Sequence, residues 1–208
     1  GIMAFKKRSS SVIEEEVILA TLSDVLEKYQ NSSDLGEKQM LLEDIIKHEG
    51  GDKAIVTILG DINEPKEIAL FAAMTLSRVT PHSAPIDEIL QLLRSDEAHI
   101  RNSAISILQD YGDSIKHHVE KFLHDDERDV RIFAVNVLGD VQFEESRTLL
   151  LDLIKTEHDV NVAMTAVDYL AEIGQPEDVE ILKKLEARFP GEAYVSFAIN
   201  NAISMIEG

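Results

Sequence analysis

The sequence predicts an all-α protein, an α-α superhelix in which about five helical hairpins follow N-terminal capping helices. The main observation is a pattern of small and apolar residues, spaced four apart, that returns about every 30 to 33 residues. A second is composition: aromatic residues make up only 5% of the chain and Trp is absent, so Leu, Ile, Val and Ala must fill the core. Such residues suit helices that pack closely on one another.

Two segments carry the repeat most clearly. LRSDEAHIR at 93–101 aligns with LHDDERDVR at 123–131 without a gap, and the helices that follow continue the match. Residues four apart lie on one face of a helix, so we expect this face to pack between neighbouring helices. The expected buried positions are Ile68, Ala72 and Leu76; Ile100, Ala104 and Leu108; Val130, Ala134 and Leu138; Val162, Ala166 and Leu170; and Val195, Ile199 and Ile203.

A shorter amphipathic segment precedes each of these helices, with a turn containing Asp, Gly or Pro between hairpins. One hairpin cannot bury its own apolar face, so the stacked hairpins must share a continuous core. The predicted hairpins are 51–80, 84–112, 113–142, 143–174 and 175–207, which together make a repeat region over 51–208.

The segment before the repeats is predicted to cap the stack. We expect a flexible basic tail over 1–10 and capping helices within 11–50, at about 11–30 and 35–48, which form a single structural domain with the repeats. Ser11 with Glu14, and Asp34 with Glu37, have the spacing of N-terminal capping boxes.

The pattern D-x-x-x-x-[IV]-R-x-x-A-x-x-x-L in 84–112 and 113–142 resembles HEAT repeats, and the resemblance extends over roughly 51–207. It implies a right-handed HEAT-like solenoid, an armadillo-like helical protein whose second helices line a concave protein-binding face. It also implies that Arg101 and Arg131, five residues after Asp96 and Asp126, tie adjacent repeats together.

Charge restricts the classes of partner. The formal net charge is −19, from 39 acidic and 20 basic residues. A field of this sign repels phosphate backbones and anionic membranes, so we expect no nucleic-acid partner and no membrane insertion. No apolar segment follows the basic residues near the N-terminus, which favours a cytoplasmic protein.

Catalytic and metal-binding motifs are missing from the sequence. There is no Cys, and none of the seven histidines has the H-E-x-x-H spacing of a zinc site. No phosphate-binding glycine loop or nucleophile elbow appears either. We therefore expect no catalytic residue, no cofactor-binding residue, no metal ligand and no cofactor. On fold alone, an enzyme or enzyme subunit of the phycobilin-lyase-like HEAT class stays open as the alternative.

The predicted function is a non-enzymatic scaffold or adaptor that binds a partner protein along the concave face. At 100° per residue, the helix face opposite the buried positions mixes aliphatic side chains with amides. We expect a partner that is basic or presents an amphipathic helix, with self-association as the other use of this surface. The predicted partner-binding residues are Leu70, Met74, Asn102, Ser106, Gln109, Ile132, Val135, Asn136, Met164, Val167, Asp168, Phe197 and Asn201. The double substitution Asn136→Arg/Asp168→Arg is expected to abolish binding without altering the fold.

Overall fold

The computed structural model describes residues 20–208, and within that range it consists of helices and turns with no strand. The described residues form two compact units, divided between Ile107 and Leu108. This boundary falls within helix α7 (Ala98–Tyr111). No helix in the described part is long and apolar enough to cross a membrane. The predicted tail over 1–10, the start of the predicted first helix and the predicted Ser11–Glu14 capping box lie outside the described residues.

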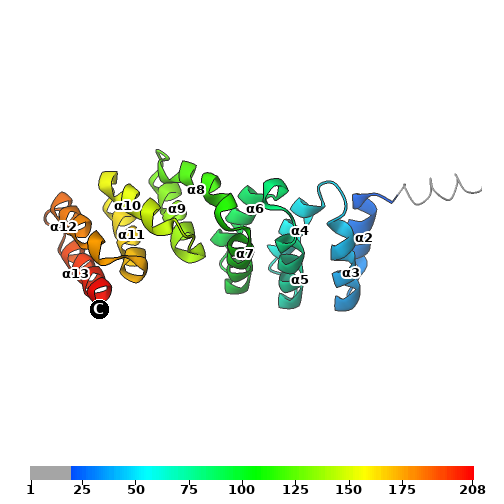
Figure 1. The fold of residues 1–208 in the computed structure, drawn as a ribbon. Helices are drawn as coiled ribbons and strands as arrows, with labels where there is room; N and C mark the ends of the chain where they lie inside the picture. Colours follow the sequence, from blue (N-terminus) through cyan, green and yellow to red (C-terminus); the bar gives the residue numbers. More distant parts are fainter. Residues whose placement is uncertain (1–19) are drawn as a thin grey trace, which may run out of the picture. The chain divides into compact units, whose positions relative to one another are not determined.

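The first unit contains two helical hairpins, followed by the first helix of a third (Figure 1). The helices are α2 (Leu22–Asn31), α3 (Leu35–Ile45), α4 (Gly51–Leu59), α5 (Lys66–Ser77) and α6 (Ile86–Gln91), with short 3₁₀ turns at Pro81–Ser83 and Leu92–Arg94. Helix α3 packs on α2 within its hairpin and on α5 of the next one.

The second unit contains three complete hairpins (Figure 1). After a 3₁₀ turn at Gly112–Ile115 come α8 (Lys116–Leu123), α9 (Arg128–Val141), α10 (Ser146–Thr156), α11 (Val160–Ile173), α12 (Val179–Arg188) and α13 (Ala193–Glu207), with a further 3₁₀ turn at Pro176–Asp178. Helix α11 packs between α9 and α13, so the second helices of these hairpins form one row. The all-α fold of helical hairpins is confirmed.

The repeated small and apolar positions form the core, as predicted. Ala72, Ala104, Ala134 and Ala166 are fully buried, as are the Leu residues four positions after each. Val130 and Ile203 differ, because both are half-buried. In α13 it is Ala202, rather than Ile203, that turns inward.

The start of the first helix is different from the prediction. Residues 20 and 21 are not helical, and Thr21 caps α2 with a complete capping box. Thr21 Oγ1 accepts from Asp24 N at 3.2 Å, and Asp24 Oδ2 accepts from Thr21 N at 3.0 Å. For α3, Asp34 accepts from Glu37 N as expected, but its own N–H donates to Ser32 Oγ instead of Glu37.

Candidate partner-binding surfaces

The predicted partner-binding residues divide by exposure. Those that are exposed are Leu70, Met74, Asn102, Ser106, Gln109, Asp168, Phe197 and Asn201. Ile132 and Asn136 are half-buried, whereas Val135, Met164 and Val167 are buried. We call the face of a second helix opposite its buried positions its outer face. In α5 and α13 the outer face is exposed to solvent, whereas in α9 and α11 much of it is covered by other helices.

The prediction that Val135, Met164 and Val167 are exposed is wrong, since all three are buried, and helix stacking gives the reason for the two valines. Helix α9 contacts α8, α10 and α11, and α11 contacts α9, α10 and α13. An inner helix of a stack is therefore covered by its hairpin partner and by neighbours on both flanks. Side chains about 100° from the centre of the buried stripe, such as Val135 and Val167, then meet a flanking helix.

Gln109 is exposed but has a structural contact. Its Nε2 donates to the backbone oxygen of Val141 at 3.2 Å, at the end of α9. Carbonyl groups in the last turn of a helix have no intrahelical partner, so this bond satisfies one of them. Gln109 therefore has a role in the fold that its place in the pattern did not reveal.

Tyr169 connects α11 to α9 and was missed by the sequence analysis. Its ring lies over Gly139, where a Cβ atom would come within 2.1–2.2 Å of three ring carbons. The hydroxyl lies 2.9 Å from Asp140 Oδ1 and 3.2 Å from Asn136 Oδ1. The hydroxyl has one hydrogen, and we assign its donation to the Asp140 carboxylate because a hydrogen bond to a charged acceptor is stronger than one to an amide oxygen. Burial, followed by the bond to Asp140, raises the pKa of Tyr169.

This contact alters the expectation for Asn136. Because Asn136 is half-buried beside the Tyr169 hydroxyl, an arginine at this position would disturb the packing between α9 and α11. The double substitution Asn136→Arg/Asp168→Arg would therefore not separate binding from folding. Asp168 is exposed and better suited to such a test.

In the second unit, α13 has the most exposed apolar face. Phe197 is 76% exposed and Met205 is 53% exposed, with Asn201 between them. Spacings of four residues place these side chains on one face, and Asn201 Nδ2 lies 3.7 Å from Met205 Sδ. Tyr194, at 45% exposure, continues the same face towards the start of the helix.

In the first unit, the outer faces of α3 and α5 carry a similar apolar surface. Leu70 and Met74 are each 56% exposed, and Met40 on α3 is 74% exposed. Met40 lies about 160° and 140° around α3 from the buried Leu42 and Ile45, so it is on the face of that helix opposite the core. Met40 was not predicted, because it precedes residue 51, where the repeat pattern begins.

The arginines of the repeat motif serve the fold. Arg131 Nε and Nη2 donate to the Glu157 carboxylate at 2.9 and 3.0 Å, and Nη1 donates to the backbone oxygens of Asp125 and Asp126. The acidic partner is thus Glu157 of the next repeat rather than the Asp126 side chain. Arg101 donates to the backbone oxygen of Ser95 at 2.7 Å.

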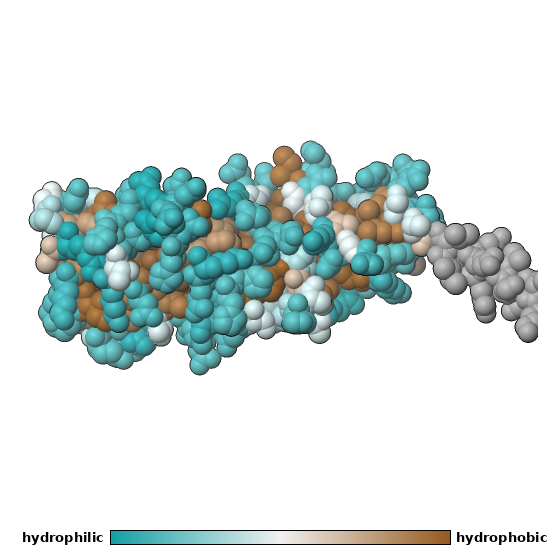
Figure 2. All heavy atoms as spheres, turned by 90° about the horizontal axis from the view of Figure 1, so that it is seen from above, coloured by the Kyte–Doolittle hydropathy of each residue, from teal (hydrophilic) through white to brown (hydrophobic). Residues whose placement is uncertain are grey.

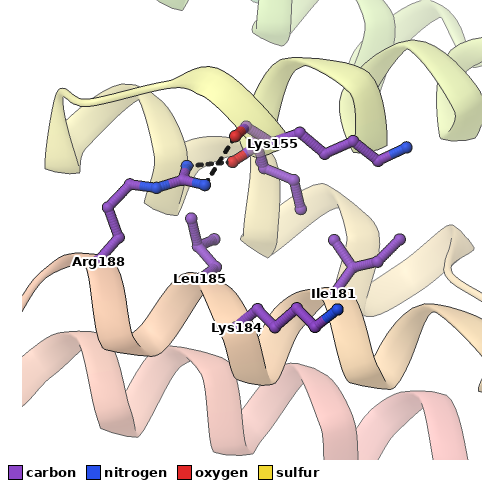
Figure 3. A pocket seen from close by; sticks show the side chains of 6 residues that line it. Lys155, Ile181, Lys184, Leu185 and Arg188 are labelled. Atoms are coloured by element: carbon purple, nitrogen blue, oxygen red, sulfur yellow. Dashed lines mark hydrogen bonds between the residues drawn. The ribbon is translucent and has the colours of Figure 1, made fainter.

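A hollow of about 300 Å³ lies between α10 and α12 (Figure 3). Figure 3 shows Arg188 reaching across to the carbonyl oxygens at the end of α10, while Leu185 and Ile181 point towards the hollow. Arg188 donates to the backbone oxygens of Ile154, Lys155 and Glu157. Its guanidinium therefore serves as a helix cap, and an anionic ligand would have to compete with those bonds.

In the first unit, α2 and α4 enclose a hollow of about 430 Å³. The carboxylate of Glu64 in its lining is already paired: Lys38 Nζ lies 3.1 Å from Glu64 Oε2 and 4.9 Å from the centre of the Tyr29 ring. The buried Tyr29 hydroxyl has no hydrogen-bond partner among the described residues. Burial, followed by the charge of Glu64, raises the pKa of Tyr29. These contacts give the hollow a structural role. Within residues 20–208, no group of three His, Asp or Glu side chains is arranged to hold a metal ion.

Comparison with known proteins finds one family model that part of the chain resembles. Residues 115–189 match the family model of HEAT repeats. This part of the chain is therefore similar to HEAT repeats. The matched segment covers α8 to α12, which includes Arg131, Glu157 and Arg188. No curated protein matches the chain.

Several solved structures resemble the chain at low identity. A computationally designed armadillo repeat protein for modular peptide recognition is 14% identical, with 86% of this chain and 97% of that chain covered and a TM-score of 0.36. A chain from the complex of CpcE and CpcF of phycocyanin lyase from Nostoc sp. PCC7120 is 14% identical, with 90% and 95% covered and a TM-score of 0.32. At these scores the likenesses carry no argument about function.

Proposed function

We propose that the chain is a protein-interaction scaffold that binds partners through the outer faces of its second helices, without catalysis. One observation carries the proposal. Of the eight large apolar side chains exposed within residues 20–208, six lie on the outer faces of second helices: Met40, Leu70, Met74, Tyr194, Phe197 and Met205. Exposed apolar side chains scattered singly are ordinary, but their concentration on one class of surface is typical of interaction sites.

The composition of the surface also supports this choice. Figure 2 shows a face on which hydrophilic side chains predominate, with smaller hydrophobic patches between them. The chain has a net charge of −19, so charged groups are abundant, yet none interrupts Phe197, Asn201 and Met205 on their face of α13. Burying this face would cost little desolvation of charge.

Capture of proteins from the source organism's lysate tests the proposal. The bait carries Leu70→Glu with Met74→Glu in the first unit, or Phe197→Glu with Met205→Glu in the second. A charge on an exposed apolar contact should remove partners bound there, because the glutamate would be buried without a counter-charge. The matched control is Thr148→Glu with Ala187→Glu, which adds the same charge at exposed positions of the first helices α10 and α12.

Proteins that wild type and control retain, and that either substituted bait loses, would support the scaffold. Equal retention by all baits would contradict it. A chromophore that copurifies with the native protein would instead favour the phycobilin-lyase-like alternative. Circular dichroism of each variant checks that helicity is preserved.

A further inference from the structure

The second helices of the second unit have an unbalanced charge. Helices α11 and α13 contain no Lys, Arg or His in their combined sequence. Their charged residues, Asp168, Glu172 and Glu207, are all acidic and exposed. Helix α9 adds Asp140 beside Tyr169. This row of helices is therefore acidic, with no basic residue of α11 or α13 to neutralise it.

The positions of these acids are unfavourable for the isolated protein. Asp140 lies in the last turn of α9 and Glu172 in the last turn of α11, and neither turn contains a basic residue. The C-terminal end of a helix carries partial negative charge, so it favours cations and disfavours carboxylates. A cation from another molecule would relieve this repulsion at both helix ends.

The basic residues on either side of Asp140 in the sequence are engaged elsewhere. Arg147, which follows it, binds Asp178. Arg128 and Arg131 lie in the first turn of α9, about 13 to 18 Å along the helix from Asp140 at 1.5 Å per residue. Arg131 binds Glu157, and Arg128 lies 3.6 Å from Asp159. Neither is placed to neutralise the acidic helix ends.

Asp168 is well suited to bind a cation. It is one repeat after Asn136, in the middle of α11. Although it is exposed, the surrounding protein removes part of its hydration, and this desolvation raises the pKa of the carboxyl. A partly dehydrated carboxylate gains more from a cation than a fully hydrated one, because the surrounding dielectric is lower.

We propose that the outer face of α11 and α13 binds an amphipathic helix with a basic edge. Its apolar stripe would lie on Phe197 and Met205, and its Lys or Arg side chains would meet Asp168 and Glu172. This inference rests on the proposed function and names the partner's chemistry. Charge complementarity selects this occupant over a second copy of the chain, since each copy carries a charge of −19 and this face offers no cation.

Binding of synthetic peptides to the full chain tests the proposal. The probe is a Leu- and Lys-containing amphipathic helix, compared with a scrambled peptide of identical composition and with a peptide in which Glu replaces Lys. Fluorescence anisotropy of labelled peptide gives Kd at low and high salt. We expect the basic amphipathic peptide alone to bind, and to bind more weakly as salt screens the charges.

Two sets of variants locate the contact. Phe197→Ala should raise Kd about tenfold, the loss expected for an aromatic anchor. Asp168→Asn with Glu172→Gln should raise Kd about fivefold at low salt and by less at high salt. The matched control is Asp152→Asn with Glu180→Gln, which removes two acids from α10 and α12 and should leave Kd unchanged.

No binding of the basic peptide, equal binding of the scrambled or Glu-containing peptide, or an equal effect of the control variant would each overturn the proposal. If lysate partners still depend on Phe197 and Met205 in that case, the scaffold function stands and only the basic helix is rejected. Analytical ultracentrifugation tests whether a second copy of the chain binds this face instead. A dimer that Phe197→Glu abolishes would show that it does, and would also overturn the proposal.

Discussion

The strongest prediction about stability concerns the ion pair between Arg131 and Glu157. Substituting Arg131 with Met removes two charge-assisted bonds of 2.9 and 3.0 Å. It leaves the Glu157 side chain, only 4% exposed, with a bond from Asp159 N at 3.1 Å but no counter-charge. Breaking a buried pair from one side costs about 3 to 5 kcal/mol. Because the Arg131 side chain is itself 18% exposed, we expect the lower end, about 3 kcal/mol.

Urea unfolding followed by far-UV circular dichroism measures this loss, and hydrogen exchange locates it at the turn between α10 and α11. The matched control is Arg128→Met: Arg128 is 52% exposed and lies 3.6 Å from Asp159, so its loss should cost below about 0.5 kcal/mol. Adding Glu157→Gln to Arg131→Met removes the stranded charge and should recover about half of the loss.

A loss below about 1 kcal/mol for Arg131→Met, or one no larger than that of Arg128→Met, would refute this reasoning. A double variant no more stable than Arg131→Met would show that the buried charge of Glu157 is not the source of the cost.

Two further predictions concern the same unit. Gly139→Ala should destabilise the protein by about 2 kcal/mol in urea unfolding, because the new Cβ displaces the Tyr169 ring; Gly36→Ala, whose Cβ would meet nothing closer than 3.7 Å, should not destabilise it. Burial alone would raise the pKa of Asp178, but hydrogen bonds from Arg147 and from Gln175 N outweigh it and lower this pKa. The stabilisation from Asp178 is therefore present above its unfolded pKa of about 3.9 and lost as pH falls through the lower folded value. The stability cost of Asp178→Asn, measured by urea unfolding at several pH values, should accordingly be largest near neutrality and shrink in acid; a cost independent of pH would contradict the assignment.

The repeat pattern predicted the core because burial follows helical periodicity. Ala134 and Leu138 belong to a stripe that any stacking of hairpins must cover, so the four-residue spacing was sufficient to place them. Residues at the edge of the stripe, such as Val135 and Val167, depend on how closely the next helix approaches. That distance is set by side chains on another repeat. The periodicity of a single helix carries no information about those side chains.

The missed contacts are those between repeats. Glu157 carries no motif, and its pairing with Arg131 is apparent only when the two turns lie side by side. The position of Tyr169 beside the buried stripe gave no sign of a contact with α9. Gly139 likewise could not be distinguished in the sequence from the small residues of the other repeats. Cross-repeat pairs of this kind become predictable only with the packing of adjacent hairpins known.

The Tyr169 ring over Gly139 also limits how far the repeats are interchangeable. At the position of Gly139, the other repeats have Ser77, Gln109, Ala171 and Ser204. Each of these has the Cβ atom that Tyr169 excludes. A recombinant chain in which another hairpin preceded α10 and α11 would meet a steric clash despite an intact repeat consensus. The order of these two modules is thus encoded by one large side chain and one missing methyl group, and shuffling or deleting repeats here would have to treat the pair as a unit.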